Sequence, residues 1–167
     1  MELTGPEIAL AGPNWVSRLV EALQPLSIRA DRLGSLALFA GLQRADLEFA
    51  ARCFAETLVE RGTRMTVQGH PSLRLWLITQ GEALVSADAR PLRVATRGDA
   101  VGGATLLTRL NSPETTIALT SIRAFEAGPD QFRELIGQRS IRQRFAAISG
   151  MKRTARRRSS PAGAAPR

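Results

Sequence analysis

Residues 57–98 read TLVERGTRMTVQGHPSLRLWLITQGEALVSADARPLRVATRG, a series of short apolar runs that end at glycines. Gly62, Gly69, Gly81 and Gly98 each close a run of about five to eight residues, the usual length of a β-strand. Glycine suits such positions because tight turns between antiparallel strands need positive φ angles. A further run, TTIALTSIRAF, occupies residues 115–125. The pattern predicts short antiparallel strands in a sandwich or roll.

Helical patterns flank this β region on both sides, because apolar residues recur there at steps of three and four. Before it we expect helices over residues 14–23, with Trp15, Leu19 and Leu23 on one face, over 27–33, and from Ala45, where the apolar face comprises Leu47, Ala50, Ala51, Phe54 and Leu58. After it we expect helices over 129–137 and 140–150. The stretch LALFAGL at residues 36–42 is expected to form a hydrophobic plug between two of these helices.

These patterns predict a mainly β fold: an antiparallel β-roll of the double-stranded β-helix or jelly-roll type, with N- and C-terminal α-helices. The predicted organisation is an N-terminal helical segment at residues 1–32, a folded domain at 33–150 and a disordered basic tail at 151–167. The tail is rich in Arg, Ser, Pro and Ala, a composition that does not build a core.

The composition excludes several classes of protein. With 167 residues and 44% apolar content, the chain is one domain and not a large multidomain enzyme. One cysteine, Cys53, and one histidine, His70, exclude an internal disulfide and a metal site built from several His or Cys ligands. We therefore expect no catalytic residues, no metal and no enzyme activity. Cys53 is expected to be a buried hydrophobe, His70 an exposed turn residue and Trp76 a core residue.

Neither a transmembrane segment nor a secretory signal is expected from the sequence. No apolar stretch approaches the roughly 20 residues of a membrane span. Met1–Arg18 has two acidic residues, two prolines and no early basic cluster, so it does not resemble a signal peptide. The predicted location is cytoplasmic. Arginine supplies 22 of the 23 basic residues, which together with many alanines favours a bacterial source.

The net charge of +8 is concentrated at one end of the chain. Residues 139–167 contain nine basic residues and no acidic one, whereas the preceding residues contain 14 basic and 15 acidic ones. The body of the protein is therefore close to neutral. Three interpretations of the basic tail stay open: a solvated disordered end, a non-specific contact with nucleic acid or an anionic membrane surface, and a basophilic kinase site at residues 156–159.

Three motifs occur in a fixed order along the chain. They are LFAGL at residues 38–42, Gly62, Gly69 and Gly81 spaced seven and then twelve residues apart with Trp76 between the last two, and GDAVGG at residues 98–103. From about Leu33 to Phe145 this order resembles the cyclic-nucleotide-binding domain of catabolite-activator transcription factors and of the regulatory subunits of cAMP-dependent kinase. In that family GDAVGG corresponds to the entrance of a cassette that holds the cyclic phosphate.

The resemblance implies a ligand-binding cassette from Val101 to Thr116. Backbone amides at the start of a short helix can bind a phosphate, because their N–H groups point outward and the helix dipole favours an anion. The candidate ligand-binding residues are Val101, Gly102, Gly103, Ala104, Thr105, Leu106, Arg109, Glu114, Thr115 and Thr116. The implied cofactor is a cyclic nucleotide, cAMP or cGMP.

Two residues of the cassette depart from the family pattern. Gly103 occupies the position of the glutamate that accepts from the ribose hydroxyl, and Glu114 occupies the position of the arginine that pairs with the phosphate. At ~1.5–3 kcal/mol for each lost charge-assisted contact, the pair accounts for about two to four decades of affinity. Binding of a cyclic nucleotide is therefore expected to be weak or absent. Arg109 is the alternative source of a cation, with Thr115 or Thr116 donating hydroxyl hydrogen bonds.

The predicted function is a non-enzymatic regulatory module that senses a small anionic ligand and relays its binding to the C-terminal helices. The alternative is a degenerate, ligand-free domain that acts as a scaffold for an unidentified protein partner. A cupin-type metalloenzyme, which shares the roll, is disfavoured by the single histidine. Sequence-specific DNA binding is not expected, since only about 20 residues follow the roll and its helices. Pairing of two copies through the last helix stays open.

Overall fold

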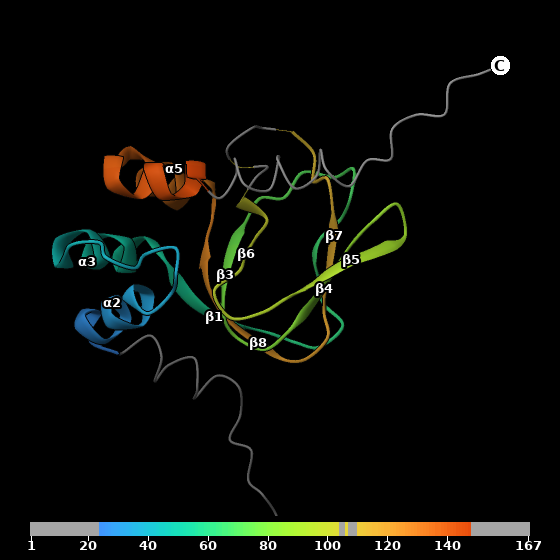
Figure 1. Ribbon diagram of the computed structural model, residues 1–167, viewed down its shortest axis with the longest axis horizontal. Helices are drawn as coiled ribbons and strands as arrows, with labels where there is room; N and C mark the ends of the chain where they lie inside the picture. Colours follow the sequence, from blue (N-terminus) through green and yellow to red (C-terminus); the bar gives the residue numbers. More distant parts are fainter. Residues whose placement is uncertain (1–23, 104–105, 107–109, 148–167) are drawn as a thin grey trace, which may run out of the picture.

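The computed structural model of the chain describes residues 24–103, 106 and 110–147. The helix expected at residues 14–23 and the tail expected at 151–167 lie outside these residues. The described part contains two four-stranded antiparallel sheets and a group of helices gathered on the outer side of one of them, as Figure 1 shows. The prediction of a mainly β roll with flanking helices is therefore confirmed.

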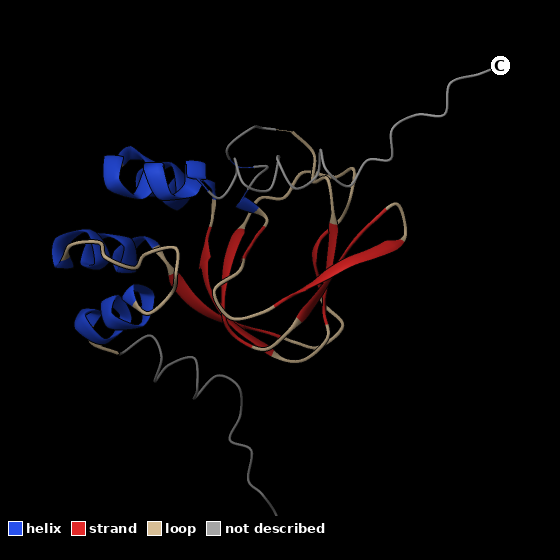
Figure 2. Ribbon diagram, in the orientation of Figure 1, coloured by secondary structure: helices blue, strands red, loops and turns tan. Residues whose placement is uncertain are grey.

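The first sheet has the strand order β1-β8-β3-β6 and the second has the order β2-β7-β4-β5. The strands are β1 (Ala55–Val59), β2 (Arg64–Thr66), β3 (Leu75–Gln80), β4 (Ala83–Ala87), β5 (Arg90–Ala95), β6 (Ala100–Val101), β7 (Thr115–Ala118) and β8 (Ile122–Ala127). Figure 2 shows the two sheets facing each other, with the helices on the side of the first sheet. Consecutive strands repeatedly cross between the sheets, which makes the structure a roll and not a meander.

The turns lie where the glycines predicted them. Gly62, Gly69, Gly81 and Gly98 all have φ between +81° and +96°. Gly81 is required for a second reason: a Cβ there would lie 2.5 Å from the carbonyl oxygen of Ser121. The run at 115–125 is divided into β7 and β8 by a bend at residues 119–121, and this bend passes against Gly81.

The helices are α2 (Leu26–Gly34), α3 (Arg44–Cys53) and α5 (Pro129–Gly137), and residues 139–147 are also helical. They confirm the expected helices at 27–33 and 129–137, and the beginning of the one at 140–150. The expectation that Phe54 and Leu58 continue the third helix is wrong. Phe54 has an extended backbone with φ −97° and ψ 141°, and Leu58 lies in β1. Helix α2 spans residue 32, the predicted domain boundary.

The apolar side chains form two cores, one on each face of the first sheet. The first lies between this sheet and the helices and contains the plug residues Leu36, Leu38 and Phe39. The second lies inside the roll, between the two sheets, where Ile78 and Val85 are almost completely buried. Strand alternation explains the division, because successive residues of a strand point to opposite faces. Cys53 is 5% exposed in the first core, as expected.

Aromatic rings connect the elements of the first core. Phe39 of the plug lies 6.1 Å from Phe54 and 6.3 Å from Phe145 between ring centroids, and both pairs meet edge to face. Phe132 of α5 lies 5.5 Å from Phe145 in the same arrangement, and Phe54 lies 5.9 Å from Phe125 of β8. Edge-to-face pairs add about 0.5–1.5 kcal/mol each to the burial of the rings. The plug, the first sheet and the C-terminal helices therefore pack as one unit.

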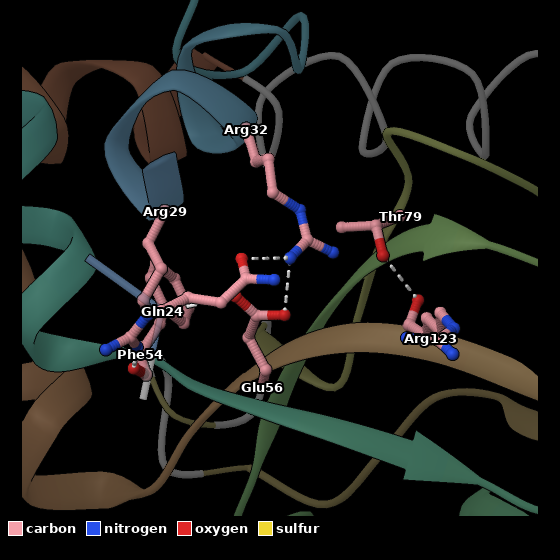
Figure 3. A network of polar contacts seen from close by, with 7 residues as sticks. All are labelled: Gln24, Arg29, Arg32, Phe54, Glu56, Thr79 and Arg123. Atoms are coloured by element: carbon pink, nitrogen blue, oxygen red, sulfur yellow. Dashed lines mark hydrogen bonds and ion pairs between the residues drawn. The ribbon is translucent and has the colours of Figure 1, made fainter. Parts of the chain in front are cut away.

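An ion-pair network fixes α2 to the first sheet (Figure 3). The side chain of Glu56 on β1 is only 8% exposed, and Arg32 donates to it at 2.7 Å while Arg29 lies 3.8 Å away. Arg29 also donates to the carbonyl oxygen of Phe54. The guanidinium of Arg32 stands 5.8 Å from the centre of the Phe125 ring, within range of a cation–π contact. Because Glu56 is buried, removing its charge would leave two arginines without their counter-ion.

Candidate functional site

The cassette begins where β6 ends. Val101 is buried and pairs with Trp76 of β3, and Gly102 turns the chain with φ +84°. Gly103 and Leu106 are in helical conformation, while the candidate residues Ala104, Thr105 and Arg109 lie outside the described residues. The described part therefore shows a sharp turn at Gly102, between a strand residue and a residue in helical conformation.

Gly102 is held against the beginning of β3. A Cβ at this position would overlap the carbonyl oxygen of Arg74 and would lie 2.9 Å from Ser72 Oγ and 3.3 Å from Trp76 Cε3. The neighbouring backbone cannot yield as a flexible side chain could. Both the positive φ and the close approach consequently require glycine at position 102.

Gly103 is constrained by the first core. A Cβ at this residue would lie 2.8 Å from Leu75 Cδ1, and Leu75 is completely buried. A glutamate at this position, as the family has, would need Leu75 to change its rotamer or move. A core side chain therefore occupies the space where a side chain at position 103 would begin.

The chain returns to the roll through residues 112–116. The backbone of Ser112 exchanges hydrogen bonds with the adjacent turn: its carbonyl accepts from the Gly69 N–H at 2.9 Å, and its N–H donates to the His70 carbonyl at 2.7 Å. Ser112 Oγ and Thr66 Oγ1 both donate to the carbonyl oxygen of Glu114, at 2.7 Å and 3.0 Å. These bonds join the C-terminal part of the cassette to the turn that follows β2. His70 itself is exposed, as expected.

Glu114 is therefore fixed by its backbone and free at its carboxylate. Its N–H donates weakly to Ser112 Oγ at 3.4 Å, and its carboxylate makes no hydrogen bond or ion pair with the residues that the structure describes. Its side chain is partly exposed, whereas Ser112 and Thr116 on either side of it are buried.

The two threonines of the cassette have different surroundings. Thr115 Oγ1 accepts a hydrogen bond from the Gln68 N–H at 2.9 Å and so stabilises the loop after β2. Thr116 is 2% exposed and pairs with Thr66 on one side and Val85 on the other, on the inner face of the second sheet. Of the predicted pair of hydroxyl donors, Thr116 is the one that lies inside the roll.

A hollow of about 280 Å³ is lined by residues of β1, β2, β3 and β8, and Trp76 on its wall pairs with Val101 of the cassette. Its walls include Val59, Met65, Trp76, Arg64, Glu60 and an ion pair between Arg74 and Glu126. Sequence reasoning missed Arg74 and Glu126 as site residues. Arg74 is two residues from Trp76, a spacing that predicts the same strand face, but the pairing of β3 with β8 that brings Glu126 to Trp76 is not visible in the sequence.

Trp76 separates this hollow from the cassette. It packs against the second core, as expected for a core residue, and its ring edge would touch a Cβ at Gly102. Leu106, on the other side of the cassette, packs against the first core together with Phe132 and Phe145. The cassette therefore contacts both cores, one through Trp76 and the other through Leu106.

Metal ligation has no support in the described residues, where no three His, Cys, Asp or Glu side chains come together. The carboxylate of Asp99 closes its own turn by accepting a hydrogen bond from the Thr96 N–H at 2.9 Å. None of the helices within the described ranges is long and apolar enough to cross a membrane.

Comparison with solved structures places the chain among cyclic-nucleotide-binding folds. A cAMP-binding acyltransferase from Mycobacterium smegmatis superposes with a TM-score of 0.62 at 25% identity, over 78% of this chain and 42% of that one. The catabolite activator protein of Thermus thermophilus gives 0.64 at 19% identity, over 71% and 58%. The regulatory subunit of a cAMP-independent protein kinase A from Trypanosoma brucei gives 0.65 at 18%, over 87% and 48%.

The sequence comparisons are negative: no protein-family model matches the chain, and no curated protein matches it. The chain spans between 42% and 58% of the lengths of the three solved proteins above. What these proteins share with it is the fold, a β-roll with helices on one side. The resemblance to the cyclic-nucleotide-binding domain is confirmed at that level.

Proposed function

We propose that this domain is a non-enzymatic regulatory module that binds a small anionic ligand of the cyclic-nucleotide type weakly in its cassette. The observation that carries the proposal is the turn at Gly102, with φ +84° and no room for a Cβ beside Arg74 and Ser72. A turn from a strand into the start of a helical segment can present main-chain amides to an anion without any side chain. The turn at Gly102 therefore supports a main-chain binding site.

The side-chain half of the site explains the low affinity. Gly103 offers no acceptor to a ribose hydroxyl, and Leu75 fills the space next to it. The carboxylate of Glu114 has no counter-ion among the described residues and would repel an anion in the cassette. An interaction between two like charges about 6 Å apart costs roughly 2–3 kcal/mol at an effective dielectric constant of 20. We therefore expect dissociation constants in the millimolar range for cAMP and cGMP.

Relay to the C-terminal helices follows from the packing of Leu106. This side chain belongs to the first core, which also contains Phe132 of α5 and Phe145 of the last helix. A ligand that draws the cassette toward its phosphate would displace Leu106 from these rings. Since close-packed cores respond to small shifts by repacking, the C-terminal helices would change position.

Titration with cAMP and cGMP tests this proposal. We expect weak saturable binding to the wild type by NMR, with shifts at Thr115, Thr116 and Phe145. Glu114→Arg should tighten binding at least tenfold, because it replaces a repelling charge with an attracting one. Glu82→Arg, which makes the same change at an exposed turn distant from the cassette in sequence, is the matched control. The absence of binding at millimolar ligand in both the wild type and Glu114→Arg would refute ligand sensing.

The alternative function is a ligand-free scaffold, and the outer face of the second sheet favours it. Leu92, Val94 and Leu119 are 56%, 45% and 38% exposed there, and Leu84 pairs with Val94 in the register of β4 and β5. Clustered exposed apolar side chains are typical of interaction surfaces. A triple variant discriminates the two functions. Gly103→Glu and Glu114→Arg restore the glutamate and the arginine of the family pattern, and Leu75→Val makes room for the new glutamate. Failure of this variant to bind cyclic nucleotides favours the scaffold.

Cytoplasmic location, the absence of DNA recognition and pairing of two copies through the last helix stay predictions from the sequence. Of these, pairing is the simplest to measure. Analytical ultracentrifugation of the full chain gives its mass in solution, and a monomer over the micromolar range would exclude the pair.

A further inference from the structure

The hollow of about 280 Å³ beside Trp76 is a second candidate binding site, apart from the cassette. No described residue of the cassette, at 101–103, 106 or 110–116, is among its lining residues. Two of the strands that line it, β1 and β2, each form the edge of a sheet. The volume is close to the lower end of the ~300–1,000 Å³ range of ligand pockets, so a ligand of this hollow must be small.

The deeper part of the lining is apolar. Val59 and Met65 are 8% and 5% exposed and belong to the second core. Trp76 packs against the same core but is only half-buried, and it also lines the hollow. A thioether adapts its shape to its neighbours, and an indole ring provides a large apolar surface. This part of the hollow is therefore suited to an aliphatic or aromatic group.

A recessed carboxylate lies next to this apolar surface. Glu126 of β8 is directly opposite Trp76 in the register of β3 and β8, so both side chains are on the inner face of the roll. The Glu126 side chain is 18% exposed, and that of its ion-pair partner Arg74 is 58% exposed. Within the described residues, Arg74 is the one donor to this carboxylate, and it donates to Oε1. Since a carboxylate has about four acceptor positions, Glu126 can accept from a second cation.

The rim of the hollow has a cation that can bind a ligand. Arg64 is exposed and lines the hollow, and it forms no ion pair with the residues that the structure describes. The charged residues of the lining are two arginines and two glutamates, which are Arg64, Arg74, Glu60 and Glu126. This balance does not favour a ligand of one sign. A ligand with one positive and one negative group matches the lining best, because each group finds a charge-assisted contact.

We propose that the hollow binds a small zwitterion with an apolar side chain, namely a free α-amino acid of the phenylalanine or leucine type. Glu126 accepts from its ammonium group, which also lies within the range of a cation–π contact with Trp76. Arg64 donates to its carboxylate, and Val59 and Met65 contact its side chain. The site goes beyond the proposed function, since it uses none of the cassette residues.

Fluorescence of Trp76 tests the proposal. The chain has two tryptophans, so a full chain with Trp15→Phe has Trp76 as its single indole. We expect L-phenylalanine and L-leucine to change its emission saturably. Two analogues, 3-phenylpropanoate without the ammonium group and phenethylamine without the carboxylate, should each bind at least tenfold more weakly than L-phenylalanine. The absence of a saturable change with either amino acid at millimolar concentration would refute the site.

Substitutions identify the groups that bind the two charges. Glu126→Gln should weaken L-phenylalanine at least tenfold and leave 3-phenylpropanoate unchanged, a difference that a general loss of structure does not produce. Arg64→Gln should weaken L-phenylalanine but not phenethylamine, and because Arg64 is exposed this variant decides the matter if Glu126→Gln does not fold. Glu82→Gln, at an exposed turn outside the lining, is the matched control. Wild-type affinity for L-phenylalanine in both lining variants would overturn the proposal.

The same protein separates this site from the cassette. Glu114→Arg changes the cassette and should leave the affinity for L-phenylalanine unchanged, because Glu114 does not line the hollow. Binding of the amino acid without binding of cAMP would keep this site and refute only ligand sensing by the cassette. A change in amino-acid affinity on Glu114→Arg, equal to that on Glu126→Gln, would show that the hollow is not a separate site.

Discussion

Gly102→Ala provides the most direct test of the cassette geometry. Two separate costs are expected. The first is the positive φ of +84°, which costs an L-residue about 1–2 kcal/mol. The second is steric: the new Cβ would overlap the Arg74 carbonyl oxygen and lie 2.9 Å from Ser72 Oγ. Overpacking of this kind costs about 1–3 kcal/mol, because the backbone of β3 or of the cassette must move.

Gly98→Ala separates the two costs. Gly98 has φ +91°, but nothing lies within 4 Å of a Cβ at that position, so only the first cost applies. Gly102→Ala should therefore lower the free energy of unfolding by about 2 kcal/mol more than Gly98→Ala does. For a domain of this size the difference corresponds to roughly 4–8 °C in Tm.

Urea denaturation followed by circular dichroism measures both variants against the wild type. Gly81→Ala adds an intermediate case, since its Cβ would lie 2.5 Å from the Ser121 carbonyl oxygen. Equal destabilisation by Gly98→Ala and Gly102→Ala would show that the cassette does not press against β3. The main-chain site proposed for an anion would then have no structural basis.

Three further changes have defined outcomes. Glu56→Gln should lower the free energy of unfolding, measured by urea denaturation, by about 2–3 kcal/mol, because it leaves Arg29 and Arg32 without their buried counter-ion. The control Glu48→Gln removes an exposed ion pair with Arg44 and should lower it by less than about 0.5 kcal/mol. Burial raises the pKa of the Cys53 thiol from 9.0 to about 11, so native Cys53 should react with a disulfide reagent at pH 8 about a hundredfold more slowly than the unfolded chain. Because the folded state holds this proton more tightly, the contribution of Cys53 to stability is complete below pH 9 and is lost between pH 9 and pH 11. Cys53→Ala should remove that part of the pH dependence, and an unchanged pH profile would contradict it.

Much of the fold was predictable because it depends on local patterns. The turns at Gly62, Gly69, Gly81 and Gly98 follow from the conformational freedom of glycine between apolar runs, and all four have positive φ. The plug and α5 follow from apolar spacing and from start and stop residues close in the chain. The end of α3 was not predictable in this way, since Phe54 continues the helical spacing but is drawn into an extended conformation next to β1.

The candidate site, like the fold, was predictable from the sequence only in part. The sequence by itself predicted a cassette without the family's two usual side chains, because Gly103 and Glu114 are visible at the corresponding positions in the chain. Only the tertiary structure showed that Leu75 fills the space beside Gly103, that Gly102 lies against Arg74, and that a hollow opens beside Trp76. These contacts join residues about 25 or more positions apart. They depend on which strands pair and in which register, and that is decided by the packing of two cores and not by any local pattern.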